Sequence, residues 1–141
     1  MKHRLLTTAL LLTMLVSLTG SAWAAQPDVT ALLQVFVPDD SDLDRFAATG
    51  LPAYTFFADS LLTGTPTARL YLLEAAGLEY RLLDADMRGG NYYLAYLRPN
   101  QSPVSWGDYG RLLLTGGNYA LLRSTPQATA QLAASGLGFR A

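Results

Sequence analysis

Residues 61–83 read LLTGTPTARLYLLEAAGLEYRLL, and the pattern of this stretch decides the fold. An apolar run resembling a strand comes first, a proline and a short helical segment follow, and a second strand-like run begins at residue 79. Residues 32–51 and 119–137 have the same order of strand, proline, short helix and a closing Gly-Leu pair. Three matching copies of these signals predict a chain built from strand–helix units.

The predicted helices, residues 42–49, 68–76 and 127–135, have apolar residues at helical spacing and punctuated ends. Asp40 or Ser41 is expected to cap the first helix, because side-chain oxygens there accept from free backbone amides. Thr65-Pro66 and Thr125-Pro126 each fit a threonine cap followed by proline at the first helical position. The glycines at 50, 77 and 136 stand where left-handed residues usually end helices.

The strands complete the fold prediction. Strands over 53–57 and 79–83 give residues 32–83 the order β-α-β-β-α-β, the ferredoxin-like arrangement, in which two helices cover one sheet face. Residues 92–97 are apolar or aromatic at every position, which favours a strand covered on both faces. Strands over 111–114 and 119–122 are joined by a Gly-Gly-Asn turn, and a last strand begins near residue 139. The sequence therefore predicts an α+β fold: a ferredoxin-like β-α-β-β-α-β unit, then a partial β-β-α-β copy, with antiparallel sheets and helices on one face.

Residues 1–24 have the features of a signal peptide. A basic start is followed by an apolar run over 5–16, and Ala22-Trp23-Ala24 fits the small-residue rule for cleavage. The apolar run is shorter than the roughly 20 residues that a membrane-spanning helix needs. We therefore expect a secreted or periplasmic protein whose mature part, residues 25–141, is a single module. Because residues 139–141 resemble the start of a strand, we also expect that this module is truncated at its C-terminus or continues in the natural polypeptide.

Cleavage after residue 24 would remove side chains that commonly serve in catalysis and metal binding. It removes His3 and Lys2, which are the only histidine and lysine, and the chain has no cysteine. Loss of Lys2 and Arg4 leaves eight arginines against eleven acidic residues, a net charge of −3, which favours neither nucleic acid nor a membrane surface as partner. Without these side chains a serine nucleophile lacks its usual base, and zinc lacks its usual ligands. We predict no catalytic, cofactor-binding or metal-binding residue, and no enzymatic activity of the chain itself.

Two acidic segments invite a search for a cation site. Residues 39–44, DDSDLD, resemble a calcium loop, but Arg45 stands where that loop needs glycine and Leu51 where it needs glutamate. Acidic residues at a helix N-terminus explain the segment better. In residues 84–90, DADMRGG, the two carboxylates could reach a hard cation and the arginine with the glycines could hold an anion. A strand connection with glycines at unusual dihedral angles explains this segment better.

Aromatic residues concentrate between residues 91 and 119. Tyr92, Tyr96, Trp106 and Tyr109 form the candidate interaction surface, because aromatic side chains often anchor binding partners. The alternative is that they pack within the core or on a sheet face.

Residues 82–94 (LLDADMRGGNYYL), 109–114 (YGRLLL) and 119–123 (YALLR) carry a resemblance to a known family. They resemble the amino-terminal module of secreted bacterial zinc exopeptidases, which are similar to bacterial leucyl aminopeptidases. In that family the co-catalytic zinc pair lies in a separate, later domain, and none of its ligands has a counterpart here. The resemblance implies a non-catalytic accessory or propeptide-like module whose partner is a peptidase domain in the same or a neighbouring chain. The alternative is a stand-alone extracellular binding or structural protein that uses the aromatic surface.

Overall fold

The computed structural model describes residues 28–102 and 104–141. The first half of the fold is one four-stranded sheet with helices. Its elements are β1 (Thr30–Phe36), α2 (Asp40–Ala48), β2 (Thr55–Phe56), β3 (Ser60–Pro66), the 3-10 helix η1 (Thr67–Arg69), α3 (Tyr71–Ala75) and β4 (Tyr80–Asp84). The strands lie in the order β2-β3-β1-β4, and all neighbours are antiparallel. The predicted order of elements in this half is therefore the observed one.

The second half repeats the strand order of the first. It consists of β5 (Asn91–Tyr96), the 3-10 helix η2 (Trp106–Tyr109), β6 (Arg111–Thr115), β7 (Tyr119–Ser124), α4 (Pro126–Ala134) and β8 (Gly138–Arg140). Its sheet has the order β6-β7-β5-β8, again antiparallel throughout. The prediction of a partial β-β-α-β copy was wrong in extent, because β5 belongs to this sheet. The 3-10 helix η2 stands where the first half has the helix α2.

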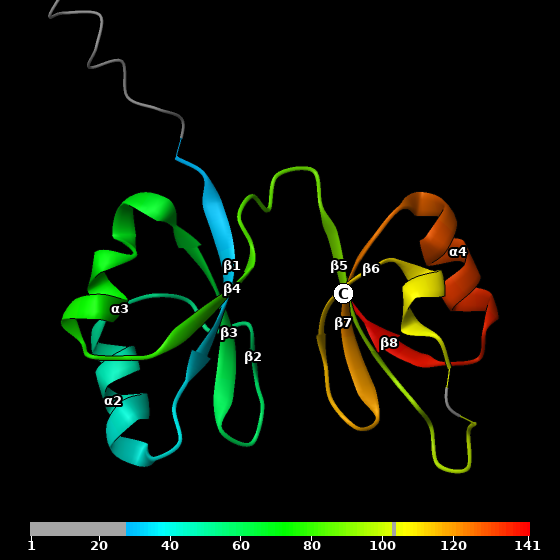
Figure 1. The fold of residues 1–141 in the computed structure, drawn as a ribbon, viewed down its shortest axis with the longest axis horizontal. Helices are drawn as coiled ribbons and strands as arrows, with labels where there is room; N and C mark the ends of the chain where they lie inside the picture. Colours follow the sequence, from blue (N-terminus) through cyan, green and yellow to red (C-terminus); the bar gives the residue numbers. More distant parts are fainter. Residues whose placement is uncertain (1–27, 103) are drawn as a thin grey trace, which may run out of the picture.

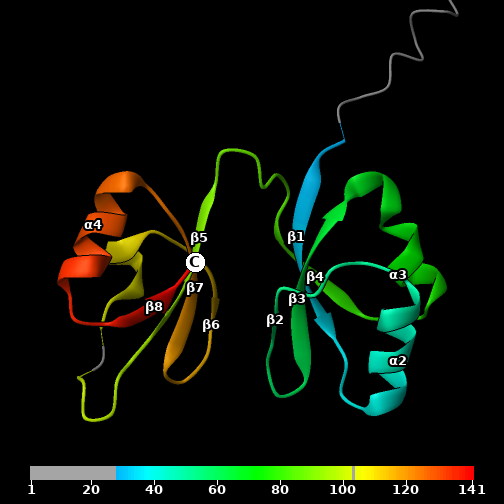
Figure 2. The same ribbon diagram turned by 180° about the vertical axis from the view of Figure 1, so that it is seen from behind.

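The α+β class is confirmed, and the two sheets pack face to face between outer layers of helices. In Figures 1 and 2, α2 and α3 lie outside the first sheet and α4 lies outside the second. Each sheet thus has helices on one face, as predicted, while its other face contacts the second sheet. Contacts between β4 and β6 place these edge strands together, and a hydrogen bond from Arg140 to Thr55 does the same for β8 and β2.

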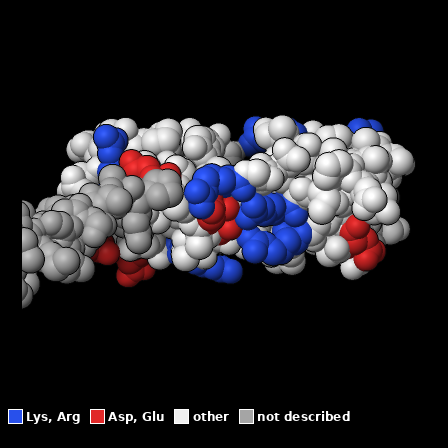
Figure 3. Space-filling model, turned by 90° about the horizontal axis from the view of Figure 1, so that it is seen from above, with Lys and Arg blue, Asp and Glu red and all other residues white. Residues whose placement is uncertain are grey.

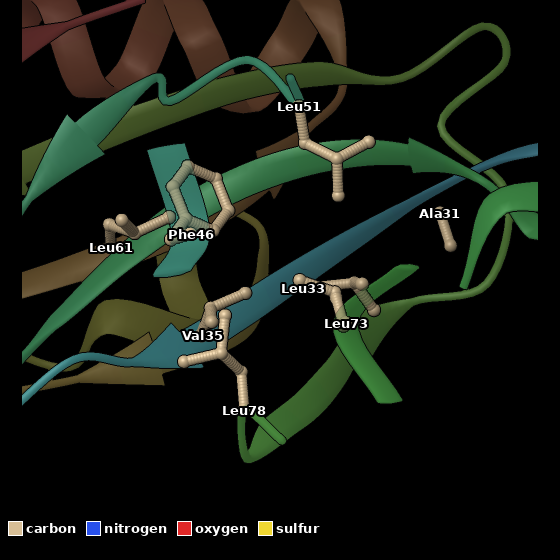
Figure 4. Close-up of a cluster of buried hydrophobic side chains, with 8 residues drawn as sticks. All are labelled: Ala31, Leu33, Val35, Phe46, Leu51, Leu61, Leu73 and Leu78. Carbon is tan, nitrogen blue, oxygen red and sulfur yellow. The ribbon is translucent and has the colours of Figure 1, made fainter. Parts of the chain in front are cut away.

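The alternation of side chains along β1 explains this layering. Leu33 and Val35 point to the helix side and are fully buried against Phe46 of α2 and Leu73 of α3 (Figure 4). Leu32 points to the opposite face, into a core shared by both sheets. The apolar residues at successive positions of β1 therefore reflect a strand that is covered on both faces.

The core between the sheets joins the two halves. Leu32 and Leu62 of the first sheet pack with Leu114 and Leu121 of the second. Phe57 and Tyr119, one from each half, stack with their ring centroids 5.1 Å apart and their planes 15° apart. A third cluster, under α4, fills the helix side of the second sheet and is built from Ala95, Ala120, Leu122, Leu132 and Leu137. At about 1.5–3 kcal/mol for each fully buried large side chain, these clusters provide most of the drive for folding.

The helix ends confirm part of the capping prediction and correct the rest. The cap of α2 is Asp39, rather than Asp40 or Ser41, and its side chain accepts from the Asp42 amide at 2.9 Å. Thr125 caps α4 with Pro126 at the first position, as predicted, whereas Thr65 is a buried residue of β3 and caps nothing. The three predicted C-terminal glycines all have left-handed backbones, with φ of 69°, 66° and 76° at residues 50, 77 and 136.

The predicted signal peptide, residues 1–24, lies outside the described residues. Within residues 28–102 and 104–141, no helix combines the length and the apolar character that crossing a bilayer requires.

Candidate functional site

A buried carboxylate at the end of β4 is the centre of the main polar cluster. The side chain of Asp84 is 6% exposed and faces three donors from the second half. The Tyr92 hydroxyl donates to its Oδ2 at 2.9 Å, and Nη atoms of Arg111 and Arg123 each lie 2.7 Å from the same oxygen. Strands β5, β6 and β7 thus each direct one side chain at a carboxylate of the first half.

Arg123 extends the cluster to the connection between β4 and β5. Besides its contact with Asp84, it donates to the carbonyl oxygens of Asp86 at 3.0 Å and Arg88 at 3.1 Å. Its guanidinium also lies 5.8 Å from the centroid of the Tyr92 ring, within the range of a cation–π contact. In the view from above in Figure 3, basic side chains lie beside acidic ones near the middle of the molecule. Arg123 therefore links its own strand, β7, to the Asp84 carboxylate and to the connection between β4 and β5.

These contacts lower the pKa values of the two aspartates and raise the pKa of Tyr92. Burial by itself raises the pKa of Asp84, but hydrogen bonds from Tyr92, the Asp86 amide and the two arginines outweigh it and leave that pKa below its usual value. Hydrogen bonds from the Arg88 side chain and amide lower the pKa of Asp86 to about 2. Burial, with the neighbouring Asp84 carboxylate, raises the pKa of Tyr92 to about 12. The arrangement keeps the carboxylates charged and the phenol neutral over the whole physiological range.

The Tyr92→Phe variant should remove a pH dependence of stability at high pH. Because the Tyr92 pKa is raised by folding, the stability it contributes is complete below pH 10 and is lost as the pH rises towards 12. The variant should lose about 1 kcal/mol at pH 7, the usual contribution of one hydrogen bond, and should decline less than the wild type between pH 10 and 12. Urea unfolding at pH 7, 10 and 11.5 measures both effects. Tyr71→Phe, the same change at an exposed ring outside the cluster, is the control, and equal slopes for both variants would contradict this role of Tyr92.

The acidic segment 39–44 forms the N-terminal cap and first turn of α2. Asp39 is the cap of α2, and Asp42 forms an ion pair with Arg45 one turn later. Arg45 also donates to the carbonyl oxygen of Ala76 at 2.9 Å, which ties α2 to the end of α3. No group of three or more histidine, cysteine, aspartate or glutamate side chains that could hold a metal ion occurs within residues 28–102 and 104–141.

The four aromatic residues of the candidate interaction surface lie in different parts of the second half. Tyr92 belongs to the polar cluster and to the core between the sheets. Trp106 and Tyr109 are in η2 and pack against the core under α4. Tyr96, 44% exposed, stands at the far end of β5 next to Gly138. The structure brings Trp106 and Tyr109 together, and it separates them from the other two.

A cleft of about 460 Å³ opens between the two sheets at the edge where β2 faces β8. Apolar side chains from both halves form most of its wall, and Arg140, whose side chain is charged, lines it together with Ala141. Sequence reasoning missed both this cleft and the role of Arg123. A charged residue between buried neighbours on β7 is the one local signal that could have suggested a buried partner for Arg123.

Comparisons of this chain with protein-family models, with curated proteins and with solved structures found no match.

Proposed function

We propose that this chain is an extracytoplasmic, non-catalytic accessory module that assists a zinc exopeptidase-type domain in the same or a neighbouring chain. The single observation that carries the non-catalytic part is the polar cluster, in which each carboxylate and the Tyr92 phenol are held by fixed partners. A general acid or base works best with a pKa near the working pH. Here the pKa of Asp86 is about 2 and that of Tyr92 about 12, while Asp84 has a lowered pKa.

The hydrogen bonds of the cluster support the same proposal. Oδ2 of Asp84 already accepts from three donors, and its Oδ1 accepts from the Asp86 amide at 3.3 Å. Asp86 is likewise held by Arg88, with Nε and Nη2 each within 3.0 Å of its carboxylate. The Asp84 carboxylate and its two arginines connect the two halves of the fold, which is a structural role. The resemblance of residues 82–94, 109–114 and 119–123 to a peptidase-associated module supplies the partner class.

Refolding of a partner enzyme tests the proposal. The processed chain, purified after export, is mixed with a denatured secreted zinc aminopeptidase from the same organism, and recovered leucine p-nitroanilide hydrolysis is measured. We expect the chain alone to hydrolyse nothing and to increase the recovered activity severalfold over an equal concentration of albumin. Hydrolysis by the chain alone, or recovery no better than with albumin, would contradict the proposal.

A stand-alone extracellular binding protein is the second candidate, and the cleft between the sheets favours it. Its volume of about 460 Å³ lies within the range of small-molecule sites, and its wall is mostly apolar. Of the four proposed aromatic residues, Tyr92 lines this cleft. Binding of a small molecule without any effect on peptidase refolding would favour this candidate over the first.

A further inference from the structure

The cleft exists because the two edges of the sheet pair are filled differently. At the β4–β6 edge, Leu83 and Leu113 pack against the core between the sheets, and Asp84 meets Arg111. At the β2–β8 edge, β2 has only two residues, and Gly64 of β3 presents no side chain. The ring of Tyr54 lies over Gly64 and occupies the space that a Cβ at that position would need. Tyr54 also lines the cleft.

Most of the wall of the cleft is apolar. Leu32 and Leu62 come from the first sheet, and Leu94 and Leu121 come from the second. Met87 closes the side near the β4–β5 connection with a flexible, polarisable side chain. A ligand that fills this space must therefore carry an apolar chain or side chain.

Arg140 adds a cation to this apolar wall. Its Nη2 donates to the Thr55 hydroxyl at 2.5 Å, and the ion pairs of the described residues involve other arginines. Residues 1–27 and 103, which the structure does not describe, include no aspartate or glutamate that could pair with it. At the β4–β6 edge of the same sheet pair, two arginines do hold a carboxylate, that of the buried Asp84. An arginine fits a carboxylate with two parallel donors, and such contacts are stronger than neutral hydrogen bonds.

We propose that the cleft between the sheets binds a small amphipathic carboxylate, with its apolar part between Leu62 and Leu94 and its carboxylate on Arg140. A fatty acid and the C-terminal end of a short apolar peptide both provide this chemistry. The site rests on the second candidate function above, whose ligand class it names, and it does not depend on the accessory function, because no peptidase takes part in the binding.

Titration calorimetry of the processed chain with defined ligands tests this site. Decanoate is compared with decanol and decyltrimethylammonium, which keep the chain and remove or reverse the charge, and N-acetyl-Leu-Leu represents a peptide end. We expect a carboxylate to bind at one site at least tenfold more tightly than both decyl controls. Tighter binding of decanoate would identify a lipid-derived ligand, and tighter binding of the acetylated dipeptide a peptide end.

Matched variants locate the site. Arg140→Gln should weaken carboxylate binding about tenfold, and it is expected to fold because Arg140 is exposed. Arg81→Gln, on β4 at the position that corresponds to Arg140 on β8, is exposed, lies outside the cleft and should leave the affinity unchanged. Leu94→Trp should fill the cleft and abolish binding, with far-UV circular dichroism to verify folding. Equal binding of decanoate and decanol, no binding of either carboxylate, or an affinity unaffected by Arg140→Gln would each overturn the proposal.

Discussion

Replacing Asp84 with alanine should lower the free energy of unfolding by about 2–3 kcal/mol. The carboxylate is 6% exposed and accepts from three side chains of the second half. Its removal leaves Arg111 and Arg123 facing each other without their shared counter-charge, and loss of one partner of a buried pair commonly costs about 3–5 kcal/mol. We expect a smaller cost because the two arginines are 58% and 27% exposed and can be hydrated in part.

Urea unfolding at pH 7 measures this effect, with Asp86→Ala as the matched control. Asp86 pairs with Arg88 at the surface, and exposed pairs contribute little, so the control should be close to the wild type. A double-mutant cycle between Asp84→Ala and Arg123→Ala should show clear coupling, since the side chains touch. Equal stability of Asp84→Ala and Asp86→Ala would refute the assignment of Asp84 as the tie between the halves.

The contribution of Asp84 to the free energy of unfolding should also decrease at low pH. Its pKa in the folded state lies below the value near 3.8 of a free aspartate, so its stabilising effect is complete above that value. The effect is lost as the pH falls through the folded-state pKa. The difference between the wild type and Asp84→Asn should therefore shrink as the pH falls below about 3.8.

Leu32→Ala and Leu33→Ala should each cost about 2–5 kcal/mol, although these neighbours on β1 point to opposite faces. Leu33 is 0% exposed under the helices and Leu32 is 2% exposed against the second sheet. Truncation of either leaves a cavity in a closely packed core. A sheet covered only by helices would make one of the two changes cheap, because one side chain would then face solvent.

The same unfolding measurements, with Leu82→Ala as the control, test the layering. Leu82 lies on β4 and is 55% exposed, so its truncation should change stability by less than about 0.5 kcal/mol. If Leu32→Ala matched Leu82→Ala instead of Leu33→Ala, the two sheets could not be packed as described.

Local patterns predicted the elements because each element follows from its own residues. The Thr125-Pro126 pair starts α4 and the left-handed glycines end the helices, as expected from their backbone chemistry. The same reasoning failed at Thr65, where the buried strand β3 extends through the expected cap and tertiary packing outweighs a weak local signal. It also left β5 outside the second sheet, because the pairing of β5 with β7 joins segments almost thirty residues apart in the chain.

The polar cluster and the cleft were beyond sequence reasoning for a related reason. Arg123 and Asp84 are 39 residues apart, and only the packing of one sheet on the other brings them within 2.7 Å. The segment around Asp84 and Asp86 was recognised as polar, but the donors that neutralise it come from other strands. Arg140 and Leu62 likewise meet at one cleft only after both sheets have formed.

The most direct test of the central claim, that the two halves form one unit through their shared core and Asp84, is urea unfolding followed by two signals. Trp106, in the second half, would be the only tryptophan after signal-peptide removal, so its fluorescence reports on that half. Far-UV circular dichroism reports on both halves together. We expect one cooperative transition with the same midpoint by both signals. Two separate transitions by circular dichroism, only one of them accompanied by the Trp106 signal, would contradict the claim.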